Sequence, residues 1–200
     1  MQQQFGTKPF WRNMLIYFCF FSFFGHLMIE CPYCLAQAII KGDVSTWEEV
    51  LSNPLKPFLV YGIGMILCAI VLDPLKVWIQ TKCKRKKIAC MQFYIVSVFV
   101  GMAMELGQGF LQNQPVNGVY PLWDFRDLPG NILGQAWIVN DILFGIVITF
   151  AVWHTLPMCE KKLASMSEKK LNRLTAGISV SFAALMWLTY VVFPDGMLVL

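Results

Sequence analysis

Charged residues are scarce in this chain. Lys, Arg, Asp and Glu together make up 14% of its 200 residues, whereas soluble domains carry roughly 25%. Hydrophobic residues make up 57%, and the mean hydropathy is +0.57. An ordinary soluble domain is therefore excluded. The composition predicts an integral membrane protein, and its long apolar segments predict an all-α, polytopic one.

Several sequence motifs are also missing. No G-x-x-x-x-G-K-[ST] stretch is present, so any ATPase that serves this chain is a separate subunit. Metalloprotease and nucleophile-elbow motifs are absent, so the sequence identifies no catalytic residue, and we predict no metal or cofactor. No Ser/Gly linker, low-complexity tract or internal repeat divides the chain, which favours one transmembrane domain over residues 1–200. The basic residues lie in short segments beside apolar spans, which argues against nucleic-acid binding.

Five apolar segments are each long enough to cross a bilayer, which needs about 20 residues. They are residues 13–30, 57–79, 89–112, 132–156 and 175–194. An alternative for the first segment is a kinked or re-entrant continuation past Pro32 to Ile40. An odd number of crossings places the two termini on opposite sides of the membrane.

The basic residues set the orientation of these spans. Thirteen of the sixteen Lys and Arg residues lie before the first span, at the inner end of the second span (Lys76), between the second and third, or between the fourth and fifth. Only Lys41, Lys56 and Arg126 fall on the other side. The positive-inside rule then predicts a cytoplasmic N-terminus and an external C-terminus, in a multi-pass protein of the bacterial plasma membrane.

Acidic residues gather on the outer side. Nine of the twelve map there: Glu30, Asp43, Glu48, Glu49, Glu105, Asp124, Asp127, Asp141 and Asp195. Glu105 lies about two turns, ~10 Å, below the outer end of the third span, and Asp141 lies at a similar depth in the fourth. Ionisable residues at membrane depth are costly, usually face the bundle interior and mark a site or pathway. The outer half is therefore predicted to contain an acidic site.

Small residues share the helix faces of these acids. Gly101 and Gly109 flank Glu105 at four-residue spacing, and Gly145 follows Asp141 at the same spacing. Small residues let helices approach closely, which buries an acid against a neighbouring helix. The alternative is that both acids belong to polar bridges that only hold the helices together.

The loop of residues 113–131 leaves the outer end of the helix that carries Glu105. We expect Asp124 and Asp127 to fold back over that helix. Asp127 and Asn131 are also candidate caps of the fourth helix, with Pro129 in its first turn. The predicted outward-facing pocket binds a cationic or polar solute and comprises Glu105, Gln108, Asp124, Asp127, Asn131, Glu30, Asp141 and Arg126.

A recognisable pattern follows Glu105: Tyr120-Pro-Leu-Trp123-Asp124-Phe125, then Pro129, Asn131 and Gly134. It resembles the signature of the CmpB-type ABC-transporter permeases, which are small bacterial multi-span proteins with a Glu, a WDY(S) element and then P-x-N-x-x-G. Phe125 stands where that family has Tyr. The stretch from Ser22 to Glu30 is similar to the family's first span. The resemblance implies a transport component, and structural roles are expected for Trp123, Pro129, Gly134, Gly101 and Gly109.

A second pattern combines Glu105-x-x-Gln108 with Asp124-x-x-Asp127, and it resembles the core of VanZ-like membrane proteins. It implies an alternative function, a cell-envelope protein or enzyme that binds a lipid-linked head group with Glu105 as general base. A third alternative is a non-transporting accessory subunit, because the chain is short and lacks an inverted repeat. Membrane lipids are partners in each case. A separate ATPase, another membrane subunit or a second copy of the chain are further candidates.

Two of the seven cysteines form the tetrapeptide Cys31-Pro32-Tyr33-Cys34, which is typical of glutaredoxin-like redox sites. Redox function needs a thioredoxin-like βαβ context, and the sequence does not predict one. A passive thiol pair or a disulfide is therefore expected.

Overall fold

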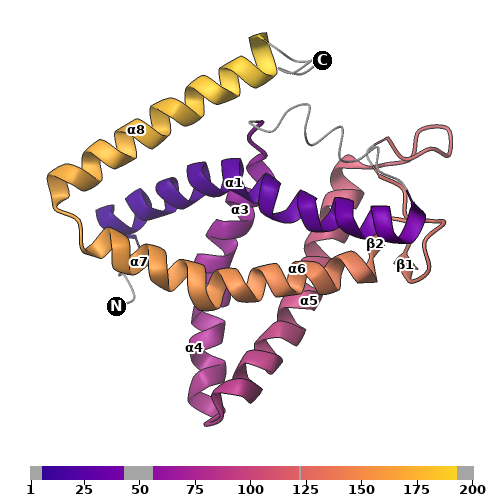
Figure 1. Cartoon of the computed structure of the whole chain (residues 1–200), viewed down its shortest axis with the longest axis horizontal. Coiled ribbons are helices and arrows are strands. Elements are labelled where there is room, and N and C mark those ends of the chain that lie inside the picture. The colour runs from indigo at the N-terminus through magenta and orange to yellow at the C-terminus, as the bar shows by residue number, and fades with distance from the viewer. Residues whose placement is uncertain (1–5, 43–55, 122, 193–200) are drawn as a thin grey trace. The chain divides into compact units, whose positions relative to one another are not determined.

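The computed structural model describes residues 6–42, 56–121 and 123–192, without the side chains of several residues between 25 and 41 (Figure 1). The elements in chain order are α1 (Lys8–Lys41), α3 (Leu59–Leu67), the π-helix η1 (Cys68–Leu72), α4 (Asp73–Lys82), α5 (Lys86–Gln112), β1 (Asn131–Ile132), β2 (Ala136–Trp137), α6 (Ile138–Phe150), the π-helix η2 (Ala151–Thr155), α7 (Leu156–Ala164), α8 (Glu168–Trp187) and the π-helix η3 (Leu188–Val192). The chain is mostly helical, which confirms the predicted class.

Four continuous helical runs in the described residues are long and apolar enough to cross a membrane. They are Leu59–Lys82, Lys86–Gln112, Ile138–Ala164 and Glu168–Val192. Helix α1 has 34 residues, which is about 51 Å of helix, and it runs through Pro32 and the Cys31–Cys34 tetrapeptide without a break. The count of five spans and their orientation stay predictions.

The predicted start of the fourth span, at residue 132, was wrong. Residues 131–137 form a hairpin in which Asn131 pairs with Trp137 and Ile132 pairs with Ala136. The turn holds Leu133 and Gly134 at φ 55 and φ 69, in the left-handed region that favours glycine. The helix therefore begins only at Ile138.

The contacts divide the chain into two compact units, which we call unit 1 (Met1–Leu72 with His154–Leu200) and unit 2 (Asp73–Trp153). In unit 1, α1 packs against α3 and α8. Gly62 of α3 lies so close to Phe18 and Ser22 of α1 that a side chain there would overlap both. The ring of Phe18 also meets that of Phe182 at a centroid distance of 5.7 Å. Small and aromatic residues therefore hold unit 1 together.

In unit 2, α5 packs along α6. The buried face of α5 repeats every four residues: Ala89, Phe93, Ser97, Gly101 and Gly109. Gly101 lies against Phe144, and a side chain at Gly145 would overlap Val98. Large apolar side chains instead point outward on these helices, including Ile88, Met91, Ile95, Phe99, Ile138, Ile142, Ile146 and Phe150. Small residues inside and large apolar residues outside are typical of a membrane bundle.

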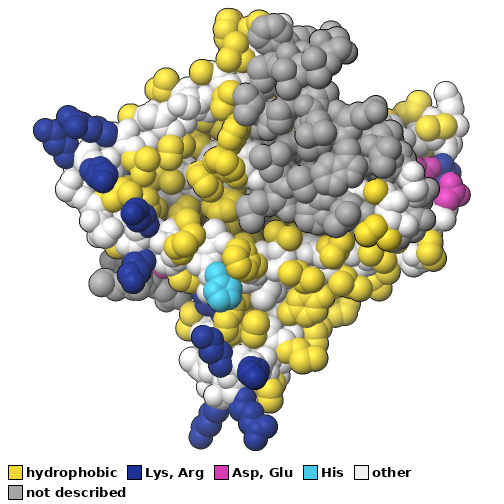
Figure 2. All heavy atoms as spheres, in the orientation of Figure 1, with side chains coloured by type: hydrophobic (Ala, Val, Ile, Leu, Met, Phe, Trp, Pro, Cys, Tyr) yellow, Lys and Arg dark blue, Asp and Glu magenta, His cyan; other side chains and the backbone are white. Residues whose placement is uncertain are grey.

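Basic side chains mark one end of unit 2. Exposed Lys and Arg residues surround the turn between α4 and α5: Lys82, Lys84, Arg85, Lys86 and Lys87. Figure 2 shows the basic side chains gathered over this turn. This end is the one that the positive-inside rule assigns to the cytoplasm.

Each π-helix ends two residues before a proline, namely Pro74, Pro157 and Pro194. A proline ring clashes with the carbonyl four residues earlier. In η1 and η2 the wider π turn provides the space, and the helix continues as α4 and α7. Asp73-Pro74 therefore continues the helix into α4. Lys76 of α4 is buried, with 8% of its surface exposed. It pairs with Asp73 and donates a hydrogen bond of 3.0 Å to the Val152 carbonyl in η2.

Candidate functional site

Glu105 lies on α5 opposite the start of α6. Its Oε1 accepts a hydrogen bond of 2.6 Å from Asn140 Nδ2, and its Oε2 accepts one of 3.2 Å from the Trp137 backbone N–H. Trp137 is the N-cap residue of α6. The amino end of a helix carries a partial positive charge. The Glu105 carboxyl group is thus placed where a helix stabilises one negative charge.

Asp141 lies one residue beyond Asn140 and is 1% exposed. Its carboxyl group lies next to the Glu105 carboxyl group. Its Oδ2 receives no N–H or O–H donor from the described residues. The ion pairs of the described residues are Arg12–Glu168, Lys76–Asp73 and Arg126–Asp124. The two carboxyl groups therefore lie together at membrane depth without a basic partner in the described part of the chain.

An amide network holds the hairpin against the end of α5. Asn113 Nδ2 donates to Gln135 Oε1 at 3.2 Å, and Gln135 Nε2 donates to the Asn113 carbonyl at 2.9 Å. Trp123 Nε1 donates to the Gln135 carbonyl at 2.9 Å. Gly109 leaves the space that the Gln135 side chain fills. Because Gln135 directly precedes β2, the network fixes the Trp137 N–H over Glu105.

Asp124 makes a bidentate ion pair with Arg126 in the loop. Arg126 Nε lies 2.9 Å and 3.0 Å from the two carboxylate oxygens of Asp124. Hydrogen bonding to Asp124 raises the pKa of the Arg126 guanidinium above its ordinary value. The same guanidinium stacks on Tyr120, 4.9 Å from the ring centroid, and donates to the Gly118 carbonyl. Arg126 is therefore engaged within the loop.

Asp127 and Asn131 do not cap the fourth helix, and Pro129 is not in its first turn, contrary to prediction. Asn131 lies in β1, and its side chain donates to the Leu128 carbonyl at 2.9 Å and accepts from the Gly134 N–H at 3.1 Å. The Pro129 carbonyl accepts a hydrogen bond of 3.1 Å from Trp137 Nε1. The cap prediction was wrong because the hairpin separates these residues from Ile138. They shape the turn that precedes the helix.

The structure brings only part of the predicted pocket together. Glu105 and Asp141 meet, whereas Asp124, Arg126 and Asn131 bond within the loop. The hydrogen-bond donors to Glu105 in the described residues are Trp137 and Asn140, not Gln108 or Asp127. The side chain of Glu30 lies outside the described residues. Sequence reasoning missed the contact between Asn140 and Glu105, although an Asn beside an Asp in an apolar span was a signal. It also missed Asn113 and Gln135.

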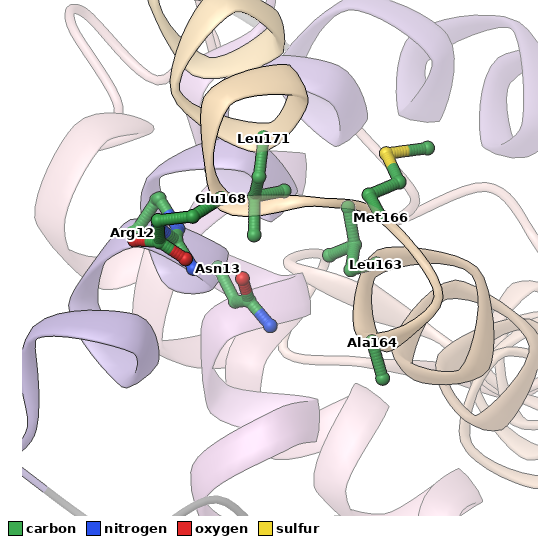
Figure 3. A pocket seen from close by; sticks show the side chains of 7 residues that line it. All are labelled: Arg12, Asn13, Leu163, Ala164, Met166, Glu168 and Leu171. Carbon is green, nitrogen blue, oxygen red and sulfur yellow. Dashed lines mark hydrogen bonds and ion pairs between the residues drawn. The ribbon is translucent and has the colours of Figure 1, made fainter.

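Unit 1 contains a small polar cavity of about 140 Å³ (Figure 3). Arg12 of α1 reaches Glu168 at the start of α8, with 2.5 Å between Arg12 Nη1 and Glu168 Oε1, and also donates to Asn172. Ligand pockets usually measure about 300 Å³ or more. This cavity has room for a few water molecules, so we do not take it as a solute site. No group of three His, Cys, Asp or Glu side chains in the described residues is placed to hold a metal ion.

Comparison with known protein families agrees with the pattern around Glu105. The family model named ABC_trans_CmpB and described as "Putative ABC-transporter type IV" matches residues 16–190. Neither the curated proteins nor the solved structures give a significant match. The match spans all the helices described above except the first residues of α1 and the last residues of η3. The chain therefore belongs to the ABC_trans_CmpB family of ABC-transporter type IV membrane proteins.

Proposed function

We propose that this protein is the membrane-spanning component of a multi-subunit transporter in the bacterial plasma membrane. Family membership and four membrane-compatible helices support a membrane transport role. The sequence contains no phosphate-binding loop, so ATP hydrolysis requires a separate subunit. With α1 as a further span, the chain crosses five times, with its N-terminus in the cytoplasm.

The observation that carries the proposal is the carboxyl pair of Glu105 and Asp141. Acidic groups in a membrane span are costly and are usually paired with a cation or used by the protein. In the described residues neither acid meets Lys or Arg. A site with acceptors and no built-in cation is suited to a cationic or polar solute.

The loop of unit 2 forms the outer part of the proposed site. Asp127 is exposed, and Asp124 holds Arg126 through a bidentate ion pair. Because Arg126 is already neutralised, it does not repel an approaching cation strongly. Gln108 is half-buried one turn beyond Glu105 and adds an amide that faces the same helix surface.

The experiment measures solute binding by the purified full-length protein in lipid nanodiscs. Its melting temperature is recorded with K⁺, Na⁺, NH₄⁺, choline, spermidine and neutral sugars. A bound solute at 100 times its Kd stabilises a protein by about 2.7 kcal/mol. We expect one cationic or polar solute to raise the melting temperature of the wild type and not that of Glu105→Gln.

Glu168→Gln is the matched control because Glu168 is an exposed acid that pairs with Arg12 in unit 1. Its response to the solute must equal that of the wild type. A Glu105→Gln variant that is stabilised as much as the wild type removes Glu105 from the site. If the wild type binds lipid-linked head groups instead of these solutes, the envelope alternative is supported.

A further inference from the structure

The two carboxyl groups of Glu105 and Asp141 differ in the hydrogen-bond donors that they meet. Glu105 already accepts hydrogen bonds from the Trp137 N–H and from Asn140. Asp141 is almost fully buried, its carboxyl group lies next to that of Glu105, and its Oδ2 lacks a donor in the described residues. Ionised carboxylates only accept hydrogen bonds, so two of them cannot bond to each other. A hydrogen bond between Glu105 and Asp141 can therefore form only when one of them holds a proton.

The basic residues of unit 2 that the structure describes do not replace that proton. On α4, Lys76 bonds to Asp73 and to the Val152 carbonyl. In the loop, Arg126 bonds to Asp124. The first basic residues of α5 lie at its other end, where Lys86 is about 28 Å of helix away from Glu105.

Tyr94 is a further titratable group of α5 that contacts this part of α6. Its hydroxyl donates to the Ile142 carbonyl at 3.4 Å, so it is turned toward the backbone of α6. Asp127 is exposed in the loop. Two adjacent like charges away from water are strongly unfavourable. One proton on the pair leaves a single negative charge, which the amino end of α6 and the Asn140 amide stabilise.

We infer that Glu105 and Asp141 form a two-carboxyl site that binds one exchangeable proton, which is released when a cationic solute enters. This inference rests on the proposed function and names the ion that the same site exchanges. The proton leaves the carboxyl pair as H⁺ while the solute brings one positive charge, so the net charge of the site is unchanged. A pair that only joins two helices would make the same hydrogen bond without exchanging its proton.

The experiment detects the proton directly by infrared spectroscopy of the full-length protein in nanodiscs at neutral pH. A protonated carboxylic acid has a C=O stretching band separate from that of a carboxylate, and the band shifts in D₂O. We expect one such band in the wild type, with a D₂O shift within minutes. The band is expected to vanish in Glu105→Gln and also in Asp141→Asn, because the remaining acid then accepts from an amide N–H.

Glu168→Gln serves as the control and must retain the band. A wild type without the band, a band that survives in either single variant, or a band that does not exchange in D₂O contradicts the inference. If Asp141→Asn fails to fold, carboxyl-¹³C aspartate and carboxyl-¹³C glutamate are incorporated separately into the unmutated protein. Both labels are then expected to move part of the band, and a shift with only one label excludes sharing.

The outcomes separate this inference from the proposed function. If the band is present but no solute stabilises the protein through Glu105, the proton site stands and the transport site fails. If the solute binds through Glu105 but the band is absent, the transport site stands and the proton exchange fails.

Discussion

Two half-buried acidic side chains of unit 2 have quite different surroundings. Asp73 lies beside Lys76, whose ammonium also meets a backbone carbonyl, so its charge is balanced within one helical turn. Glu105 lies beside another acid and two neutral donors. In the first arrangement no unbalanced charge is left for a ligand to neutralise. In the second arrangement no basic residue of the described part of the chain balances the negative charge, so a mobile cation or a proton can do so. This difference is our reason for placing the site at Glu105.

The largest stability effect is expected from breaking the balanced pair. Lys76→Met leaves Asp73 buried without its cation, and breaking a buried pair costs roughly 3–5 kcal/mol. Unfolding in detergent with increasing SDS measures the loss. The double variant Lys76→Met/Asp73→Asn removes both charges and is expected to recover most of the stability. Equal losses in the single and double variants would show that the pair is not what stabilises α4.

The next effect concerns the packing that brings the two acids together. Gly145→Ala places a methyl group against Val98, and overpacking costs roughly 1–3 kcal/mol. Gly107→Ala is the matched control, because a side chain at Gly107 meets no atom within 4 Å. That change is expected to be neutral or to stabilise α5 by up to about 1 kcal/mol. Similar behaviour of both variants would contradict the close contact of α5 with α6.

A smaller effect is expected from changing Glu105 itself. Glu105→Gln keeps one acceptor oxygen for Asn140 and supplies an N–H for Asp141, but it loses the acceptor of the Trp137 N–H. The free energy of unfolding is therefore expected to fall by about 1 kcal/mol. Glu105→Leu leaves the Asn140 and Trp137 donors unsatisfied and is expected to cost about 1–3 kcal/mol. SDS unfolding compares the two. A large loss in Glu105→Gln would favour a purely structural role for the charge.

The smallest effect is expected at the Arg12–Glu168 pair of unit 1. The Glu168 side chain is 73% exposed, and exposed ion pairs contribute about 0–1 kcal/mol. Glu168→Gln is therefore expected to lower stability by less than about 1 kcal/mol, and the difference from the wild type is expected to shrink in high salt. A larger, salt-independent loss would show that the polar cavity beside Arg12 stabilises unit 1 more than its exposure implies.

Most of the helical architecture follows from hydropathy, because each apolar run must satisfy its backbone hydrogen bonds internally in lipid. The depth of Glu105 and Asp141 also follows, since it depends only on residue counting. The hairpin at residues 131–137 does not follow, because Ile132, Leu133 and Trp137 are as apolar as a span. Its position depends on the left-handed turn at Leu133 and Gly134 and on the amide contacts of Gln135.

The contact between Glu105 and Asn140 was not predicted from the sequence. Which residue of α6 meets α5 depends on the rotation of each helix about its axis, and Gly145 against Val98 sets that rotation. A shift of one position turns a helix face by about 100°, so Asn140, Asp141 and Ile142 were equally good candidates on spacing alone. Periodicity indicates which residues share a face, whereas packing decides what that face meets.

The three π-helices have an evolutionary consequence. A π turn contains one residue more than the α-helical turn that it replaces, so each behaves as an insertion that the helix absorbed instead of expelling as a loop. Removing that residue from η1 would turn Lys76 away by about 100° and separate it from the Val152 carbonyl. In alignments of homologous chains, single-residue gaps are therefore expected just before Pro74, Pro157 and Pro194 and not in the interhelical loops, and they should co-occur with changes at the charged residues that follow.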